Sequence, residues 1–165
     1  MTPLTEPAIR ASFVNCTKGE AKRLALPRDL AERPWADLDF LGWRDPAGAE
    51  RAYLVAESGT GLLGVALRVA SQAGRARRSM CSLCLTTHTG DGVTLMTARK
   101  AGPDGRAGNS VGSYLCADLA CSLYLRGRKS AGRRLDESIT LAEKVDRTTA
   151  NLAAFLQQVV GHTPM

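Results

Sequence analysis

Four of the five cysteines in this 165-residue chain form two close pairs, Cys81 with Cys84 and Cys116 with Cys121. Two thiolates three positions apart can turn inward from one tight knuckle and span an edge of a zinc tetrahedron with Zn–S bonds of about 2.3 Å. Cys116 follows an apolar run, residues 111–115, and Cys121 lies in a helix-favouring stretch. A strand end and a helix start can therefore present both sulfurs to one point. This layout predicts one structural Zn²⁺ with four thiolate ligands.

Disulfides, a redox dithiol and plain buried cysteines are the alternatives to a metal site. Disulfides belong to oxidising compartments, but prolines and charged residues interrupt residues 1–16 where a secretory signal needs an apolar segment. A redox dithiol usually follows a strand and opens a helix, whereas a turn-rich segment follows Cys84. No window is apolar enough to span a membrane, so we expect a cytoplasmic protein. Cys16 is expected to be a small buried residue, and His88 is the alternative fourth ligand.

Positive charge is concentrated on the predicted metal segment. The formal net charge is +6, and residues 75–134 contain 11 Lys and Arg against 3 Asp and Glu. The flanking residues 1–74 contain 9 of each, and residues 135–165 contain 2 against 4. Even after a Zn²⁺ with four thiolates contributes about −2, this segment is expected to form an electropositive face.

Local patterns predict the elements before the metal segment. A helix opens near Thr5 with a proline in its first turn, and a capping box at residues 17–20 predicts a second short helix over residues 18–26. Together they form the N-terminal helices at 5–27, and a polar connector over 27–37 follows. Extended segments are expected within residues 38–70, namely 38–43 and a β-hairpin of 51–57 with 62–69.

A treble-clef zinc finger is predicted over residues 79–130, because a cysteine knuckle, a hairpin and a helix follow one another. The hairpin strands are 93–99 and 110–115, joined by a glycine-rich connection over 101–108 that we expect to be mobile. A further capping box at Thr140 and apolar residues at alternating steps of four and three predict an amphipathic helix over 140–160. We expect this helix to pack on the sheet, with a partner-binding or dimerising helix as the alternative.

The predicted fold class is therefore α+β: an antiparallel sheet with a treble-clef, four-cysteine zinc finger, two short N-terminal helices and a C-terminal amphipathic helix. The whole chain, residues 1–165, is expected to form a single domain and to be monomeric. With two Trp, three Tyr and three Phe, its core must be mostly aliphatic.

Several sequence blocks resemble the elongation-factor-G-binding, FusB-type proteins. The blocks are Ser12-Phe-Val-Asn-Cys16, Leu38-Asp-Phe-Leu-Gly-Trp-Arg-Asp-Pro46, the cysteine pairs, and Gly112-Ser-Tyr-Leu-Cys116 with Cys121. Over about residues 7–160 the chain is similar to the C-terminal treble-clef zinc-finger domain of that family, in the stand-alone form of high-GC Gram-positive bacteria.

The resemblance implies a structural zinc held by the four cysteines and binding to elongation factor G on or off the ribosome. In resistance proteins of the family, the finger helps to release this factor from ribosomes when fusidic acid traps it. Those proteins also carry an N-terminal helical bundle, for which 165 residues leave no room. The resemblance therefore implies partner binding rather than protection against the antibiotic.

Exposed groups beside the zinc ligands are the candidate partner-binding residues, because tyrosine and arginine often anchor interfaces. They are Arg99, Lys100, Arg106, Tyr114, Arg126, Arg128 and Lys129. The alternative is that Tyr114 belongs to the core and that the cations only keep the protein in solution.

Two other classes of function compete with protein binding. Binding to ribosomal RNA is the alternative function, because clustered cations suit phosphate contacts; few aromatic residues are available for base stacking. Those cations are Arg75, Arg77, Arg78, Arg126, Arg128, Lys129, Arg133 and Arg134. Enzymatic activity is not expected, because four cysteine ligands leave no open metal position for chemistry and no catalytic motif is present.

Overall fold

The computed structural model describes residues 1–71, 80–132 and 137–161. The helices are α1 (Glu6–Ala11), α2 (Lys18–Arg23), the 3₁₀ turns η1 (Leu30–Glu32) and η2 (Trp35–Asp37), α3 (Gly102–Arg106), α4 (Cys121–Leu125) and α5 (Leu141–Val160). The strands are β1 (Leu41–Arg44), β2 (Arg51–Ser58), β3 (Gly61–Val69), β4 (Val93–Arg99) and β5 (Ser110–Cys116). The predicted α+β class is confirmed.

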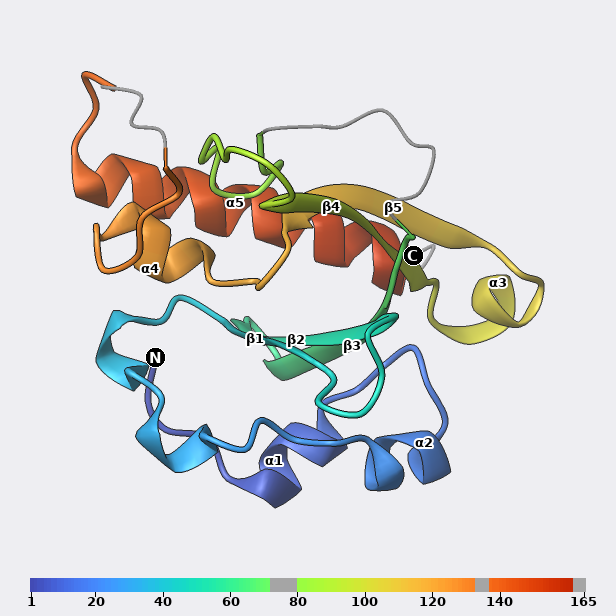
Figure 1. The fold of residues 1–165 in the computed structure, drawn as a ribbon. Coiled ribbons are helices and arrows are strands. Elements are labelled where there is room, and N and C mark those ends of the chain that lie inside the picture. The colour runs from blue at the N-terminus through green and yellow to red at the C-terminus, as the bar shows by residue number, and fades with distance from the viewer. Residues whose placement is uncertain (72–79, 133–136, 162–165) are drawn as a thin grey trace.

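The five strands form one antiparallel sheet in the order β1-β2-β3-β4-β5 (Figure 1). The hairpins β2–β3 and β4–β5 are paired along their lengths, as the sequence predicted. The ladder between β3 and β4 is short, running only from Leu67 opposite Ala98 to Val69 opposite Met96. The sheet therefore consists of two well-paired parts joined by a narrow connection.

The segment between α1 and α2 reinforces this connection. The N–H of Gly64 in β3 donates to the Ser12 carbonyl at 2.9 Å, and a Cβ at Gly64 would lie 2.4 Å from Ser12 Oγ, so this crossing requires glycine. Asn15 is buried, and its amide donates to the carbonyls of Ala66 and Arg99 at 2.9 and 3.0 Å. The Ala66 N–H returns a bond to Asn15 Oδ1 at 2.8 Å. Asn15 thus ties β3 to the end of β4.

Both faces of the sheet are covered. Along β2, Ala52, Leu54 and Ala56 face one core, whereas Tyr53 and Val55 face the other. Helix α5 lies along β4 and β5 over the first core, and α1, α2 and the 3₁₀ turns lie beneath β1 to β3 over the second (Figure 1). Because successive side chains of a strand point to opposite faces of the sheet, β2 contributes side chains to both cores.

The C-terminal helix packs on the sheet, as its pattern predicted. The Thr140 and Glu143 capping box is present. The buried stripe is Thr148, Leu152, Phe155, Leu156 and Val159. Leu141, the first residue of the helix, is 47% exposed. Within the described residues, no helix combines the length and the apolar character that crossing a bilayer demands.

Two boundaries near the N-terminus differ from the prediction. Helix α2 ends at Arg23 rather than continuing to residue 26, because Leu24 is extended and the Arg10 guanidinium caps this end by donating to the carbonyls of Ala21, Lys22 and Leu24. The connector over 27–37 is not merely polar, since it forms two 3₁₀ turns and buries Trp35.

The glycine-rich connection between β4 and β5 was expected to be a mobile loop, but it forms the short helix α3. Pro103 lies in the first turn of this helix, where its missing N–H costs nothing. Gly105 is buried, and a Cβ there would lie 1.7 Å from the Lys100 carbonyl oxygen. The glycines therefore let the chain fold back tightly onto itself at this corner.

Candidate metal centre

The four predicted ligands converge on one point from three elements. Cys81 and Cys84 lie in the turn before β4, Cys116 is the last residue of β5, and Cys121 is the first residue of α4. Their sulfurs all lie within 4.8 Å of one another. The Cys81–Cys121 and Cys84–Cys116 Sγ distances are 3.8 and 3.6 Å, close to the edge of about 3.8 Å that Zn–S bonds of about 2.3 Å give a tetrahedron. The donor set fits zinc.

The first pair is shaped by a tight turn. The Leu85 N–H donates to the Cys81 carbonyl at 2.9 Å, and Leu85 has a positive φ of 57°. The Ser82 N–H donates to the Tyr114 carbonyl at 2.7 Å, which fixes the turn against β5. The knuckle and the strand that carries Cys116 are thus joined directly by the backbone.

Burial and crowding make the cluster a cation site. All four cysteines are at most 1% exposed. Hydrogen bonds from the neighbouring thiols, Cys116 first, lower the pKa of Cys81, whereas hydrogen bonding with Cys116 and the other thiols raises the pKa of Cys121. Four thiolates so close together repel one another unless a cation lies between them. One structural zinc ion with a closed shell of four cysteines satisfies this requirement.

Neighbouring groups can donate hydrogen bonds to the sulfurs. The Leu83 N–H donates to Cys81 Sγ at 3.4 Å, and Thr86 Oγ1 lies 3.1 Å from Cys84 Sγ. His88 Nε2 lies 3.2 Å from Cys116 Sγ, and burial lowers the pKa of His88. His88 is therefore a neutral neighbour of the thiolate rather than one of the four clustered ligands.

A polar network links the second ligand pair to the surface. Asp118 lies between Cys116 and Cys121, and its carboxylate accepts hydrogen bonds from the Ala120 N–H at 3.1 Å and the Tyr124 hydroxyl at 2.7 Å. Lys129 pairs with the same carboxylate, and the ring of Tyr124 meets the edge of His88 at 4.6 Å. The chain between the two cysteines is thereby held in shape by its own side chains.

The seven predicted partner-binding residues do not form one surface. Arg126, Arg128 and Lys129 follow α4 at the end of the molecule that carries the zinc finger, which we call the finger end. Arg99, Lys100 and Arg106 lie at the opposite end around α3, which Figure 1 shows well away from α4. Tyr114 is half-buried in β5 and packs against the core that α5 covers.

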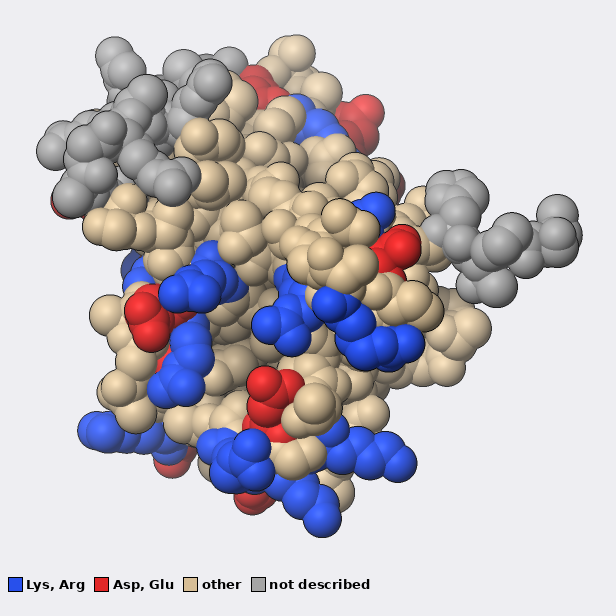
Figure 2. Space-filling view, turned by 90° about the vertical axis from the view of Figure 1, so that its right-hand side faces the viewer, with Lys and Arg blue, Asp and Glu red and all other residues tan. Residues whose placement is uncertain are grey.

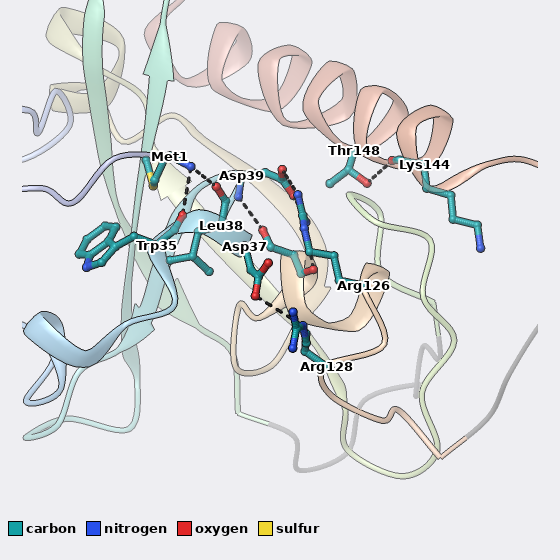
Figure 3. Close-up of polar contacts among 10 residues, drawn as sticks. Met1, Trp35, Asp37, Leu38, Asp39, Arg126, Arg128, Lys144 and Thr148 are labelled. Carbon is teal, nitrogen blue, oxygen red and sulfur yellow. Dashed lines mark hydrogen bonds and ion pairs between the residues drawn. The ribbon is translucent and has the colours of Figure 1, made fainter.

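The finger-end cations are paired with carboxylates. Arg126 makes two bonds of 2.8 Å to Asp39, and both side chains are less than a fifth exposed. Arg128 pairs with Asp37 at 3.5 Å. Figure 3 shows both pairs joining α4 to the turn at η2, whose carbonyls at Trp35 and Leu38 also accept bonds from the Met1 amino group. Arg126 therefore connects the finger to the N-terminal half.

A groove opens beside the knuckle at the finger end. Its volume is about 840 Å³, and it lies between the knuckle turn, the chain after α4 and the start of α5. Tyr124, Lys129 and Lys144 are among its lining residues. The remaining cations named for RNA contact, Arg75, Arg77, Arg78, Arg133 and Arg134, lie outside the described residues.

This geometry defines a class, a treble-clef protein whose closed four-cysteine zinc centre is structural. The chain matches the family model described as the FBP C-terminal treble-clef zinc-finger over residues 8–159, nearly its whole length. The chain belongs to this family, and the resemblance of its sequence blocks is confirmed. No curated protein and no solved structure is significantly similar to the chain.

Sequence reasoning missed one acidic residue that pairs with the finger and three cations of α2. Asp39 lies 87 positions before its partner Arg126, and only its place in the Leu38–Pro46 block distinguished it. Lys18, Lys22 and Arg23 were also missed, because residues 1–74 contain equal numbers of acidic and basic side chains. Their spacing at the start and the end of one short helix was the available signal.

Proposed function

We propose that this protein is a non-enzymatic zinc-finger protein that binds translation elongation factor G, free or on the ribosome. One observation carries the proposal: the family match spans residues 8–159, and all four cysteines of the finger lie in one buried cluster. A closed shell of four cysteines offers no position for a reacting water. The surface that the zinc holds in place is therefore the part of the molecule that binds the factor. Such binding would modulate the release of the factor from ribosomes.

The finger end is our candidate surface for the translation factor. Lys129 and Arg128 have side chains 47% and 65% exposed and pair with Asp118 and Asp37, and Lys129 lines the groove. Exposed ion pairs are weak, so a partner's acidic groups can replace Asp37 and Asp118 at little cost. Such charges at an interface act mainly on the association rate and its salt dependence.

Capture of purified elongation factor G by the immobilised, zinc-loaded protein tests the proposal, with and without ribosomes. We expect capture by the metal-loaded chain and its loss in Cys121→Ser, which opens the zinc shell. Arg128→Glu with Lys129→Glu should weaken capture about tenfold or more while zinc content and thermal stability stay near those of the parent. Absence of capture by the metal-loaded parent, on and off the ribosome, would refute the proposed function.

A further inference from the structure

The face that carries α2 and α3 is rich in positive charge. Figure 2 looks onto this side of the molecule and shows Lys and Arg side chains gathered over it, with few Asp and Glu between them. We call it the α2–α3 face. Its cations come from α2, from the end of β4 and from α3: Lys18, Lys22, Arg23, Arg99, Lys100 and Arg106.

These cations come from distant parts of the sequence but lie on one continuous surface. Asn15, two positions before the α2 N-cap Thr17, donates from its side-chain amide to the Arg99 carbonyl at 3.0 Å, so the end of β4 lies beside the start of α2. Bonds from the Thr17 backbone and side chain lower the pKa of Glu20 in α2, and the charges of Arg99 and Arg23 add to this effect. Arg99 Cγ lies 3.0 Å from the position of a Cβ on Gly105 in α3. The cations of α2 and of the β4–α3 corner are therefore neighbours.

The described residues offer the cations of this face no close carboxylate partner. Among the described residues, no salt bridge within 4.0 Å involves any of the six. Only Glu20 and Asp104 lie in the same stretches, residues 18–23 and 99–106. Glu20 accepts the Thr17 N–H at 2.6 Å. It feels the charges of Arg99 and Arg23, but no ion pair within 4.0 Å joins it to either of these described residues. An unpaired cluster of like charges repels itself, and a polyanion bound to it would relieve that repulsion.

The chemistry of the face fits phosphate better than a protein or a lipid surface. Among the described residues, the exposed large apolar side chains are Val14, Met80, Leu141 and Val160; Val14 and Val160 flank this face, and none of the four is aromatic. Protein interfaces are usually anchored by aromatic and other large side chains, and binding to a membrane surface uses an inserted apolar face. Phosphate contacts require only mobile cations and small hydrogen-bond donors. We propose that the α2–α3 face binds the sugar-phosphate backbone of a nucleic-acid duplex.

A salt titration of duplex binding tests this proposal on the full, zinc-loaded chain. Fluorescence anisotropy would follow a labelled RNA duplex and a DNA duplex of the same sequence between about 50 and 200 mM salt. With six phosphate contacts, the slope of log K against log salt should be about −5, which is a loss of affinity of about 10³-fold over this range. The duplex that binds with the higher affinity, RNA or DNA, identifies the source of the phosphates.

Two matched triple variants distinguish an effect of the α2–α3 face on duplex binding from an effect of the protein's net charge. Lys22→Gln with Arg99→Gln and Arg106→Gln should make the slope shallower by about 3 units. Arg128→Gln with Lys129→Gln and Lys144→Gln removes the same charge at the finger end and should change the slope by less than about 1 unit. Zinc content and thermal unfolding show that each variant is folded.

The same variants distinguish this proposal from the proposed function. The α2–α3 triple should retain capture of elongation factor G, and the finger-end triple should retain duplex binding. Equal losses of duplex binding in both triples, or no binding by the parent at about 50 mM salt, would overturn the nucleic-acid proposal. Loss of factor capture in the α2–α3 triple would also overturn it, because this face would then be a protein-docking surface.

Discussion

The two ends of this molecule both carry cations but use them differently. At the finger end, Arg126, Arg128 and Lys129 each meet a carboxylate, and the strongest of these pairs is largely buried. On the α2–α3 face, the described cations have no such partners. The difference shows that cation density along a sequence does not give the surface potential, since Asp37 and Asp39 approach α4 only after folding.

The same contrast separates structural from binding roles. The paired end depends on long-range contacts: zinc joins Cys81 to Cys121, and Arg126 reaches Asp39 across 87 positions. The α2–α3 face is supported by uncharged contacts, namely the Asn15 amide and close backbone approaches at Gly64 and Gly105. Breaking the mostly buried Arg126–Asp39 pair should therefore destabilise the first end, whereas removing charge from the second should leave it folded.

Removal of zinc should have the largest effect, and it should spread from the finger end through the segment that carries the ligands, residues 80–132. Structural zinc contributes on the order of 10 kcal/mol in zinc-finger peptides, which is comparable with the whole stability of a typical domain, about 5–15 kcal/mol. Hydrogen exchange with and without a chelator should show loss of protection over residues 80–132. The core of Ile9, Trp35, Leu41 and Val55 should keep part of its protection. Uniform loss across the chain would show that the two ends are one cooperative unit.

Breaking the buried ion pair should have the next largest effect. Asp39→Asn leaves the Arg126 guanidinium without its charge partner while both side chains are mostly buried, and breaking buried pairs costs about 3–5 kcal/mol. We expect a loss of about 3 kcal/mol of unfolding free energy. The matched control is Asp37→Asn, whose partner Arg128 is 65% exposed, and its cost should be below about 0.5 kcal/mol. Urea unfolding of the zinc-loaded protein measures both.

Equal costs for these two substitutions would contradict the ranking of the pairs by burial. In that case Asp39 would add nothing beyond a surface contact, and the connection between the finger and the N-terminal half would rest on the Asp39 N–H bond to Ser122 Oγ at 2.9 Å. The backbone of Asp39→Asn retains that bond, so the experiment isolates the contribution of the carboxylate.

Two tyrosines that donate to carboxylates give a matched comparison at alkaline pH. Burial first, and then the hydrogen bond that Tyr53 donates to Asp45, raises the pKa of Tyr53 to about 12. Burial and the bond to Asp118 likewise raise the pKa of Tyr124 at the finger end. Because the folded pKa exceeds the unfolded value of about 10, the neutral form contributes stability that is complete below a pH of about 10. That stability is lost as pH rises toward the folded pKa.

The expected loss for Tyr53 is about 2–3 kcal/mol between a pH of about 10 and one of about 12. Tyr53→Phe should flatten the decline of unfolding free energy over this range, even though it lowers stability at neutral pH. Tyr124→Phe should likewise flatten the decline, measured by far-ultraviolet circular dichroism, which does not depend on the substituted ring. An unchanged decline in Tyr53→Phe would mean that Tyr53 ionises without unfolding the protein.

Much of the fold followed from local pattern, because its elements carry strong local signals. The strand β4 (Val93–Arg99) and the capping box at Thr140 agree with the prediction, since period-two alternation and capping depend on near neighbours. The cysteine spacing predicted the metal centre for the same reason. The helix α3 was missed because the tight turn around Gly105 depends on contact with the Lys100 carbonyl, which no local propensity describes.

The surface was much harder to predict than the core. The sequence placed Arg99 and Arg126 on one partner-binding surface because both lie near zinc ligands in the chain. In the structure, the ligands lie in the turn before β4, at the end of β5 and at the start of α4, whereas α3 lies at the other end of the β4–β5 hairpin, so a strand's length separates Arg99 from Arg126. Pairing of Arg126 with Asp39, and grouping of Lys18 with Arg99, both depend on tertiary contacts between distant segments.

The smallest expected effect distinguishes the two kinds of cation most directly. Lys18→Gln removes an unpaired charge from the first turn of α2, where a cation opposes both its neighbours and the helix dipole. Lys129→Gln removes a charge that is paired with Asp118. At about 20 mM salt we expect the first to stabilise and the second to destabilise by about 0.5 kcal/mol each, or about 1–2 °C in Tm with opposite signs. At about 500 mM salt, screening should shrink both shifts. Shifts of the same sign would show that Lys18 is paired in solution, and the contrast between the two ends would then fail.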